Sequence, residues 1–314
     1  MATITMMMST KRVIVVVGPT ASGKTDLSIA LARHYNAPIL STDSRQVYKG
    51  LPIGTAYPSV EQLQAVEHHF IGELELNQDF NCGEYEKQAL ERLETLFEKH
   101  NTVVAVGGSG LYVKALCEGM DSLPEADEAL REQLQRRLAE QGVEALAEQL
   151  KTLDPEYYEV VDRCNPARVM RALEVCLVSG CKYSVLRKGA VKPRNFQIVK
   201  VGVNMERERL YERINLRVDK MLEAGLEAEA RAVLPYRHFN SLKTVGYSEM
   251  FDYFDGKIDF EQAVELIKRN SRRYAKRQLT WFGRDKDIRW FENDQLEEIV
   301  KYIDSQFGES DINS

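Results

Sequence analysis

Residues 18 to 25 read Gly18-Pro19-Thr20-Ala21-Ser22-Gly23-Lys24-Thr25, and they follow the apolar run 13–17. This is the pattern G-x-x-x-x-G-K-[ST], whose glycines let backbone N–H groups turn toward a diphosphate. The lysine reaches the outer phosphate, and the threonine hydroxyl can hold Mg²⁺. The positive end of the following helix dipole also favours an anion. Because a strand-like run precedes the motif and a helical pattern follows it, the motif predicts a phosphate-binding loop (P-loop) rather than a chance glycine-rich turn.

Strand-like and helical patterns alternate along the chain, which predicts an α/β fold: a P-loop NTPase-like parallel sheet core with helices on both faces. The predicted strands are 13–17, 38–42, 102–106 and 198–203, with 69–71 a candidate for another. Residues 121–194 show helical periodicity alone and predict a helical insertion domain, and the chain beyond 203 is expected to be helical. The predicted organisation is a core in two parts, 11–120 and 195–290, the insertion at 121–194 and an acidic C-terminal tail at 291–314.

The composition limits the classes of protein to which the chain can belong. It has 314 residues, a net charge of −6 and 44% apolar residues. No apolar run approaches the roughly 18 residues of a membrane span, and the first residues lack the pattern of a secretory signal. The five cysteines are scattered, which favours reduced thiols over disulfides or a zinc site. We expect a cytoplasmic protein with no membrane partner.

One helix near the C-terminus carries positive charge without acidic neighbours. Apolar and neutral side chains recur there at helical spacing and predict one packed seam: Val264, Ile267, Ser271, Tyr274, Gln278 and Trp281. Other faces carry the basic residues Arg269, Arg272, Arg273, Lys276 and Arg277. No acidic residue lies between 267 and 283. The pattern therefore favours an anionic partner over an ordinary solvated face.

Two further segments are expected at the same edge of the sheet as the P-loop, because ligands bind outside the carboxyl ends of parallel strands. Asp43 follows the strand 38–42, and its carboxylate could accept a proton or position Mg²⁺; the alternative is that it caps the next helix. The strand 102–106 runs into Gly107-Gly108-Ser109-Gly110, where the backbone could approach a ligand closely. It supplies no acid like the one that holds Mg²⁺ in P-loop hydrolases. We therefore expect a diphosphate that is a leaving group.

Together these segments resemble the tRNA dimethylallyltransferases, also called tRNA isopentenyltransferases, in their bacterial form. The matching motifs are GPTASGKT at 18–25, DSRQVYKGLPIGTA at 43–56, GGSGLY at 107–112, NPARVMRALEV at 165–175, VGYSEM at 245–250 and RRYAKRQLTWF at 272–282. The P-loop alone is generic, whereas DSRQVYKG with RRYAKRQLTWF is specific to this family. The resemblance covers residues 12–290. The sequence departs from it at Tyr57, where the family usually has lysine, which bears on a local tRNA or loop contact and not on the chemistry.

The resemblance implies transfer of a dimethylallyl group from dimethylallyl diphosphate to N6 of an adenine in tRNA. This adenine is position 37, just 3′ of the anticodon in tRNAs that read codons beginning with U. Asp43 would be the general base and Arg217 would neutralise the leaving diphosphate, while residues 18–25 would hold it with the cofactor Mg²⁺ at Thr25. Asp43, Thr25 and Arg217 would thus be the catalytic residues. The partners would be dimethylallyl diphosphate and the tRNA anticodon stem-loop, and the enzyme would be a monomer.

The residues expected to bind tRNA come from this resemblance and from the basic helix. They are Asp43, Ser44, Arg45, Gln46, Ser109, Arg131, Ala167, Arg168, Val169, Met170, Arg171, Lys243, Gly246, Tyr247, Arg273, Lys276 and Arg277.

Three other interpretations remain open on the residues alone. A small-molecule or nucleoside kinase would use the same loop on ATP and would need no long basic helix. A related transferase acting on free adenine nucleotide would prefer AMP to tRNA, whereas the insertion and the basic helix favour RNA. A non-catalytic P-loop module that binds RNA would not need Thr25, Asp43 and Arg217.

Overall fold

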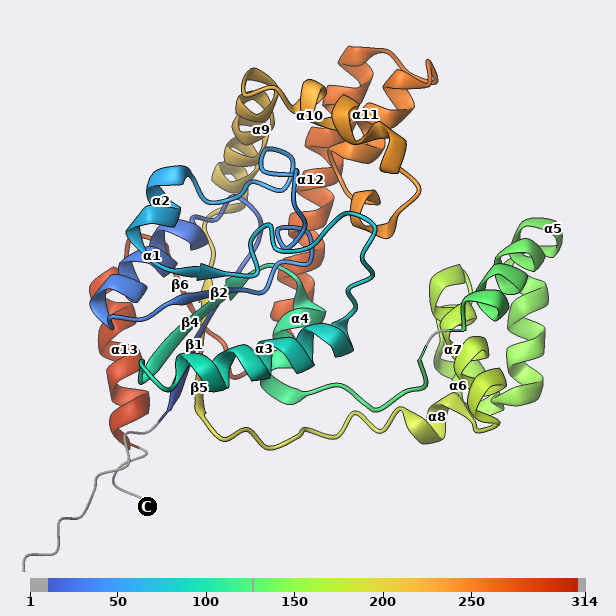
Figure 1. The fold of residues 1–314 in the computed structure, drawn as a ribbon, viewed down its shortest axis with the longest axis horizontal. Helices are drawn as coiled ribbons and strands as arrows, with labels where there is room; N and C mark the ends of the chain where they lie inside the picture. Colours follow the sequence, from blue (N-terminus) through green and yellow to red (C-terminus); the bar gives the residue numbers. More distant parts are fainter. Residues whose placement is uncertain (1–10, 126, 310–314) are drawn as a thin grey trace, which may run out of the picture. The chain divides into compact units, whose positions relative to one another are not determined.

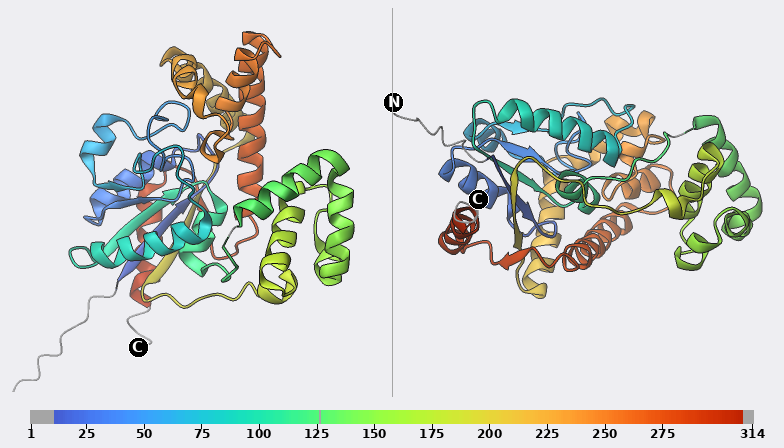
Figure 2. Two further views of the ribbon diagram at one scale, coloured as in Figure 1. Left: turned by 45° about the vertical axis from the view of Figure 1, so that its right-hand side comes forward. Right: turned by 90° about the horizontal axis from the view of Figure 1, so that it is seen from below.

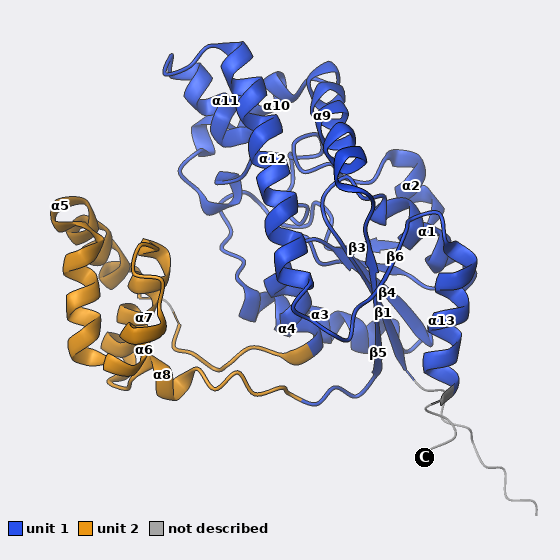
Figure 3. Cartoon of the chain, turned by 180° about the vertical axis from the view of Figure 1, so that it is seen from behind, with its two compact units in different colours: residues 1–117, 193–314 blue, residues 118–192 orange. Residues whose placement is uncertain are grey.

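The computed structural model describes residues 11–125 and 127–309, which belong to two compact units. One unit, here termed the core unit, takes in the chain up to 117 and from 193 onward; the other, residues 118–192, is the helical unit (Figure 1, Figure 3). The helical unit corresponds closely to the insertion predicted at 121–194. Its first boundary is earlier because the chain leaves the core at the end of the helix α4 (Gly110–Glu118).

A six-stranded sheet forms the centre of the core unit, with strand order β3-β2-β4-β1-β5-β6 and every neighbouring pair parallel. The strands are β1 (Arg12–Val17), β2 (Ile39–Ser41), β3 (His68–His69), β4 (Thr102–Gly107), β5 (Gln197–Val203) and β6 (Arg289–Phe291). Val17 stands in register with Gly107 and Gly202. The P-loop and the glycine-rich loop after β4 therefore leave the sheet side by side at its carboxyl edge.

The four predicted strands are confirmed within one residue at each end. The candidate strand at 69–71 lies instead at His68–His69, because Phe70 has a positive φ of 62° that ends the extended backbone. The expectation of helix alone beyond 203 is wrong at β6. This edge strand has three residues, too few for a periodic pattern to appear in the sequence.

Helices cover both faces of the sheet, as predicted. α1 (Lys24–His34) and α13 (Leu296–Glu309) lie on one face, and α3 (Cys82–Leu96) lies on the other with α4 (Figure 2). Ile299, Ile303 and Phe307 of α13 are buried in the same apolar core as β1 and β5. The described residues of the segment predicted as an acidic tail, 291–309, are therefore part of the core unit. They form an amphipathic helix whose apolar stripe is buried against the sheet.

Further helices extend beyond the carboxyl edge of the sheet (Figure 1). They are α9 (Arg207–Glu223), α10 (Leu226–Val233), α11 (Tyr247–Phe254) and α12 (Phe260–Phe282), with the 3₁₀ turns η1 (Leu234–Tyr236) and η2 (Asn240–Leu242); the small helix α2 (Val60–Ala65) precedes β3. α12 begins with a capping box, in which Asp259 and Gln262 each accept the other's backbone N–H. It packs on α9 through a small apolar cluster that includes Ile214 and Ala275.

The helical unit has an apolar core of its own. Its helices are α5 (Glu128–Leu153), α6 (Pro155–Val160), α7 (Pro166–Ser179) and α8 (Tyr183–Leu186). Gly142, with φ 79°, interrupts α5, and side chains from both of its halves meet α7 in the core. None of the described helices, in either unit, has the length and apolarity needed to cross a membrane.

Candidate active site

The P-loop joins β1 to α1 and turns at glycines that have no room for a side chain. A Cβ on Gly18 would lie 2.3 Å from the carbonyl oxygen of Val203. A Cβ on Gly23 would lie 2.6 Å from the side-chain amide nitrogen of Asn293. Both glycines have positive φ, 152° and 91°, which also favours glycine. Arg213 of α9 donates from Nε to the Ala21 carbonyl at 2.9 Å. A helix far along the chain thus fixes the middle of the loop.

Two cations meet in the pocket beside the P-loop. Lys24 donates from Nζ to the Pro19 carbonyl at 2.5 Å. Burial, reinforced by the Arg217 guanidinium, lowers the pKa of Lys24 to about 7, and Asp43 opposes this shift. Burial also lowers the pKa of Arg217, against the opposing charge of Asp43 and with some help from Arg213. Positive charges in a poorly solvated site are stabilised when an anion enters. The arrangement therefore suits a ligand with several negative charges.

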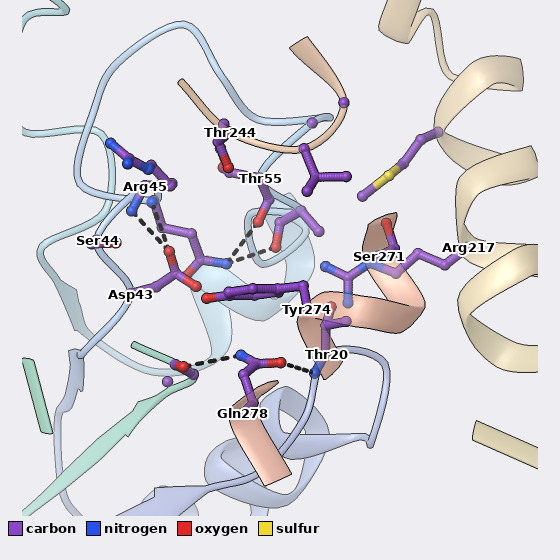
Figure 4. Close-up of a pocket in the computed structure, with 18 of the residues that line it drawn as sticks. Thr20, Asp43, Ser44, Arg45, Thr55, Arg217, Thr244, Ser271, Tyr274 and Gln278 are labelled. Carbon is purple, nitrogen blue, oxygen red and sulfur yellow. Dashed lines mark hydrogen bonds between the residues drawn. The ribbon is translucent and has the colours of Figure 1, made fainter. Parts of the chain in front are cut away.

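Asp43 follows β2 and lies across the pocket from Arg217 (Figure 4). Its Oδ1 accepts from the backbone N–H of Arg45 at 2.8 Å and from that of Gln46 at 3.3 Å. This oxygen therefore caps a turn, whereas the alternative interpretation expected it to cap a helix. Among the described residues, no hydrogen bond reaches Oδ2. One carboxylate oxygen is therefore structural, and the other is available to a ligand.

Neighbouring loops hold the segment after Asp43 in place. Ser109 accepts from the backbone N–H of Ser44 at 2.9 Å. Gln46 donates from Nε2 to two carbonyls of the loop 51–57, at 3.1 and 2.8 Å. The polar groups of Ser109 and Gln46, both expected to bind tRNA, are thus engaged within the protein. This makes the carboxylate-bearing segment rigid.

The loop 51–57 is held from its other side by Glu229 of α10. The two carboxylate oxygens accept from the N–H groups of Ile53 and Gly54 at 2.9 and 2.8 Å, and the Tyr247 hydroxyl donates to the same carboxylate at 2.6 Å. No local pattern in the sequence points to Glu229, because the backbone groups that it holds lie 176 and 175 residues away. It connects the α10–α11 region to the pocket wall.

Tyr57, the departure from the family pattern, makes an internal contact. Its hydroxyl donates to the Tyr48 carbonyl, and its ring lies against Gly72. Burial, with added effects of Glu229 and Asp43, raises the pKa of Tyr57, so the hydroxyl stays protonated. Tyr57 therefore holds the end of the loop 51–57 against Tyr48 and Gly72.

The glycines after β4 make room for α12. A Cβ on Gly108 would lie 2.0 Å from Nε2 of Gln278, and one on Gly110 would lie 2.2 Å from the indole nitrogen of Trp281. This close packing differs from the predicted reason for the glycines, which was the approach of a ligand. α12 is seated directly on the loop.

These segments enclose a pocket of about 630 Å³, a volume typical of sites for small ligands. Its wall includes many of the predicted site residues: Thr20, Lys24, Thr25, Asp43, Ser44, Arg45, Gln46, Arg217, Lys243, Gly246, Arg273 and Arg277. Apolar side chains also line it: Ile39, Ile71, Val106, Val218, Met221 and Ile267. The pocket therefore offers both charged and apolar surface to a ligand.

Tyr274 of α12 also faces the pocket, although the sequence pattern indicated only a seam residue. In Figure 4 it lies between Asp43 and Arg217. Burial, strengthened by the charge of Asp43, raises the pKa of Tyr274 to about 12. Its hydroxyl is therefore a hydrogen-bond donor at neutral pH. The one signal for it in the sequence is a polar group at a buried seam position.

Comparison with known proteins places this geometry in a family. The model of the family described as IPP transferase matches residues 46–285. The chain belongs to the IPP transferase family. It is 50% identical over 299 residues to a tRNA dimethylallyltransferase of Cytophaga hutchinsonii, which covers 95% of this chain and 98% of that protein.

Two solved structures are similar to most of this IPP transferase. The tRNA isopentenylpyrophosphate transferase of Bacillus halodurans is 36% identical, with a TM-score of 0.71 and coverage of 96% of this chain and 99% of that one. A eukaryotic dimethylallyltransferase, described as acting on tRNA, is 25% identical, with a TM-score of 0.77 and coverage of 91% and 75%. The predicted fold and transferase class are confirmed.

Some residues of this IPP transferase that were expected to bind tRNA lie in its interior. Val169 is completely buried in the apolar core of the helical unit, and Met170 packs against that core. Tyr247 has no exposed surface, and its hydroxyl is engaged by Glu229. For Val169 and Tyr247, the prediction of a side-chain contact with tRNA is wrong, because protein encloses both side chains.

Charged residues of the helical unit also have partners of their own. Arg131 and Arg171 both pair with the buried carboxylate of Glu174, at 3.1 and 2.6 Å. The pair with Arg131 joins the first half of α5 to α7, whereas the pair with Arg171 lies within α7. Ala167 and Arg168, by contrast, are exposed at the start of α7. A role for these two in tRNA binding stays a prediction.

Five of the six basic residues of α12 fall into two sets, and the sixth, Arg269, is exposed. Lys268 pairs with Asp219 at 2.7 Å, and Arg272 donates to Asn215 at 2.5 Å; both contacts tie α12 to α9. A second set is exposed and is here termed the α12 basic face: Arg273, Lys276 and Arg277. Arg273 and Arg277 also line the pocket. Positive charge is therefore available at the mouth of the site.

Proposed function

We propose that this IPP transferase moves a dimethylallyl group from dimethylallyl diphosphate to N6 of adenine 37 in tRNAs that read codons beginning with U. The observation that carries the proposal is the presence in one pocket of two poorly solvated cations, Lys24 and Arg217, and of a free carboxylate oxygen of Asp43. A departing diphosphate needs the cations, and an attacking amine needs the base. The names of the relatives support this choice of substrates.

At the donor end, the P-loop N–H groups, Lys24 and Arg217 stabilise the charge that builds on the diphosphate as its oxygen leaves the allylic carbon. The Thr25 side chain lines the same pocket, and no cluster of three or more His, Cys, Asp or Glu that could bind a metal occurs in the described part of the chain. This donor set fits Mg²⁺ bound by Thr25, diphosphate oxygens and water rather than by a cage of carboxylates. Bound there, Mg²⁺ would neutralise part of the diphosphate charge.

At the acceptor end, Oδ2 of Asp43 takes the proton that N6 loses while the nitrogen lone pair forms the new bond to the allylic carbon. The electron pair of the broken C–O bond leaves with the diphosphate. The adenine must leave its stack, at a cost on the order of a few kcal/mol that is smaller in a single-stranded loop. Tyr274, whose hydroxyl stays protonated beside Asp43, can donate a hydrogen bond to the extruded base.

The tRNA would be held by the α12 basic face and by exposed residues of the helical unit such as Arg168. Contacts of both to phosphates would position the anticodon loop without reading its sequence. We further propose that the enzyme acts as a monomer in the cytoplasm.

The proposed function is tested by incubating the purified protein with tRNA that lacks the modification, dimethylallyl diphosphate and Mg²⁺, followed by mass spectrometry of the nucleosides. N6-dimethylallyladenosine at position 37 and released diphosphate are expected. Transfer of the γ-phosphate of ATP, with dimethylallyl diphosphate ignored, would identify a kinase instead. Preferred use of AMP would identify a transferase that acts on free nucleotide.

Replacing Arg273 and Lys276 together with alanine is expected to weaken tRNA binding and to flatten its salt dependence. Each lost phosphate contact lowers the slope of log K against log salt by about 0.7–0.9. Filter binding at several salt concentrations measures this slope. Lys301→Ala, which changes an exposed cation of α13, is the matched control. An unchanged slope in the double variant would mean that the α12 basic face is only solvated.

Binding of inorganic diphosphate is expected to take up protons above pH 7. The pKa of Lys24 is about 7 in the free protein, and an anion beside it favours the ammonium, so the pKa rises on binding. The contribution of Lys24 to affinity is therefore complete below pH 7 and decreases as the pH rises toward the pKa of the bound state. Calorimetry at pH 8 in buffers of different ionisation heat measures the uptake. Uptake that is as large in Lys24→Met as in the wild type would contradict this assignment.

A further inference from the structure

Gln278 lies where three segments of the active site meet. Its side chain is 5% exposed. Oε1 accepts from the backbone N–H of Thr20 at 2.8 Å, and Nε2 donates to the carbonyl of Gly108 at 3.0 Å (Figure 4). Because one partner is a donor and the other an acceptor, the orientation of the amide is determined. One side chain of α12 thus connects the P-loop with the loop after β4.

The connection continues from Gly108 to Asp43. The next residue, Ser109, accepts from the backbone N–H of Ser44 at 2.9 Å, and Ser44 adjoins Asp43. A continuous series of bonded groups therefore runs from the diphosphate-binding loop through Gln278 to the carboxylate. The series joins segments that are distant in the sequence, and Gln278 is the member that belongs to neither loop.

Packing leaves little freedom at this junction. A methyl group on Gly108 would lie 2.0 Å from Nε2 of Gln278, and Trp281, one helical turn further along α12, covers Gly110 equally closely. The amide is therefore held by contact as well as by hydrogen bonds. A change in its shape or polarity must move one of the loops.

We propose that Gln278 is a positioning residue, which holds the diphosphate-binding loop at a set distance from the loop that carries Asp43. The inference rests on the proposed function for the reaction that these loops perform. In-line transfer requires the leaving oxygen, the allylic carbon and N6 to be aligned, and a misplacement of about 1 Å can cost about 10²-fold in rate. Because both polar atoms of Gln278 are engaged inside the protein, its effect is on alignment and not on RNA binding.

Gln278→Met tests this role, because it keeps the approximate volume of the side chain and removes both hydrogen bonds. We expect kcat to fall by about 10- to 100-fold and the affinity for inorganic diphosphate to weaken several-fold, while the KM for tRNA changes by less than about twofold. Thr280→Ala, at an exposed position of the same helix, is the matched control and is expected to behave like the wild type. A folded Gln278→Met variant with unchanged kcat, or with a loss confined to the KM for tRNA, would overturn the proposal.

A double-mutant cycle with Gly108→Ala keeps the test decisive if Gln278→Met is poorly folded. In the wild-type background the new methyl group meets Nε2, so Gly108→Ala alone should lower kcat strongly. In a Gln278→Ala background that space is free, and Gly108→Ala should cost less than about threefold more. Fully additive losses would contradict the proposal. The wild type is assayed in parallel to test the proposed function separately from the role of Gln278. If the wild type forms no dimethylallyl product, the proposed function fails. If the wild type turns over normally and the variants are unaffected, only the role of Gln278 is overturned.

Discussion

Replacing Asp43 with asparagine is expected to lower kcat by about 10²–10⁴-fold while tRNA affinity stays nearly unchanged. The asparagine side chain keeps an oxygen that can accept from the N–H groups of Arg45 and Gln46, so the turn after β2 is preserved. It replaces the free Oδ2 by an amide nitrogen, which cannot take the proton of the attacking amine. Single-turnover transfer measures the chemical step, and a separate binding titration measures affinity.

Asp43→Ala is the matched variant, because it removes the base and the turn cap together. It should be as inactive as Asp43→Asn and, unlike it, less stable, by about 1 kcal/mol for the lost cap. If Asp43→Asn lost tRNA binding to the same extent as activity, Asp43 would be a recognition residue. If it kept full turnover, another group would be the base.

Replacing Arg217 with glutamine is expected to lower kcat by about 10²–10³-fold and to weaken binding of inorganic diphosphate, because one of the two cations that stabilise the leaving group is lost. The same change should raise the pKa of Lys24, since Arg217 is, after burial, the main cause of its low value. The pH at which diphosphate affinity begins to fall should therefore move upward. Binding titrations between pH 6 and 9 measure this shift.

Arg209→Gln is the control for this prediction, since Arg209 is an exposed residue of the same helix and does not line the pocket. It should leave both kcat and diphosphate affinity unchanged. Normal kcat with reduced tRNA affinity in Arg217→Gln would instead assign Arg217 to the RNA.

The strands and the P-loop were predictable because their signals are local. Val13 to Val17 form an unbroken run of β-branched residues, and only a strand covered on both faces buries such a run completely. Gly18, Gly23 and Lys24 follow directly after this strand, within one short loop. α13 was not predicted from the sequence because only the acidic charge of this segment was considered, although Ile299 and Ile303 repeat at helical spacing.

The resemblance to family motifs predicts that whole segments contact tRNA. It does not distinguish the side chains that face solvent from those that face the protein core. Within 167–171, Val169 points into the core of the helical unit, and Arg171 pairs with Glu174. Tyr247 in the motif VGYSEM is fully buried on Glu229. A residue of a family motif can serve the packing of the core or the binding of a ligand. Its burial in the folded protein distinguishes these two roles.

The parallel sheet, the P-loop and the place of Asp43 at the sheet edge can be predicted from local sequence, because each depends on neighbouring residues and on the period of a strand or helix. Other contacts of the site appear only in the folded protein: Glu229 holds the loop 51–57, and Gln278 lies between Thr20 and Gly108. Such contacts join residues up to 258 positions apart. They form only when packing brings distant elements within hydrogen-bond distance. No local pattern in the sequence predicts them.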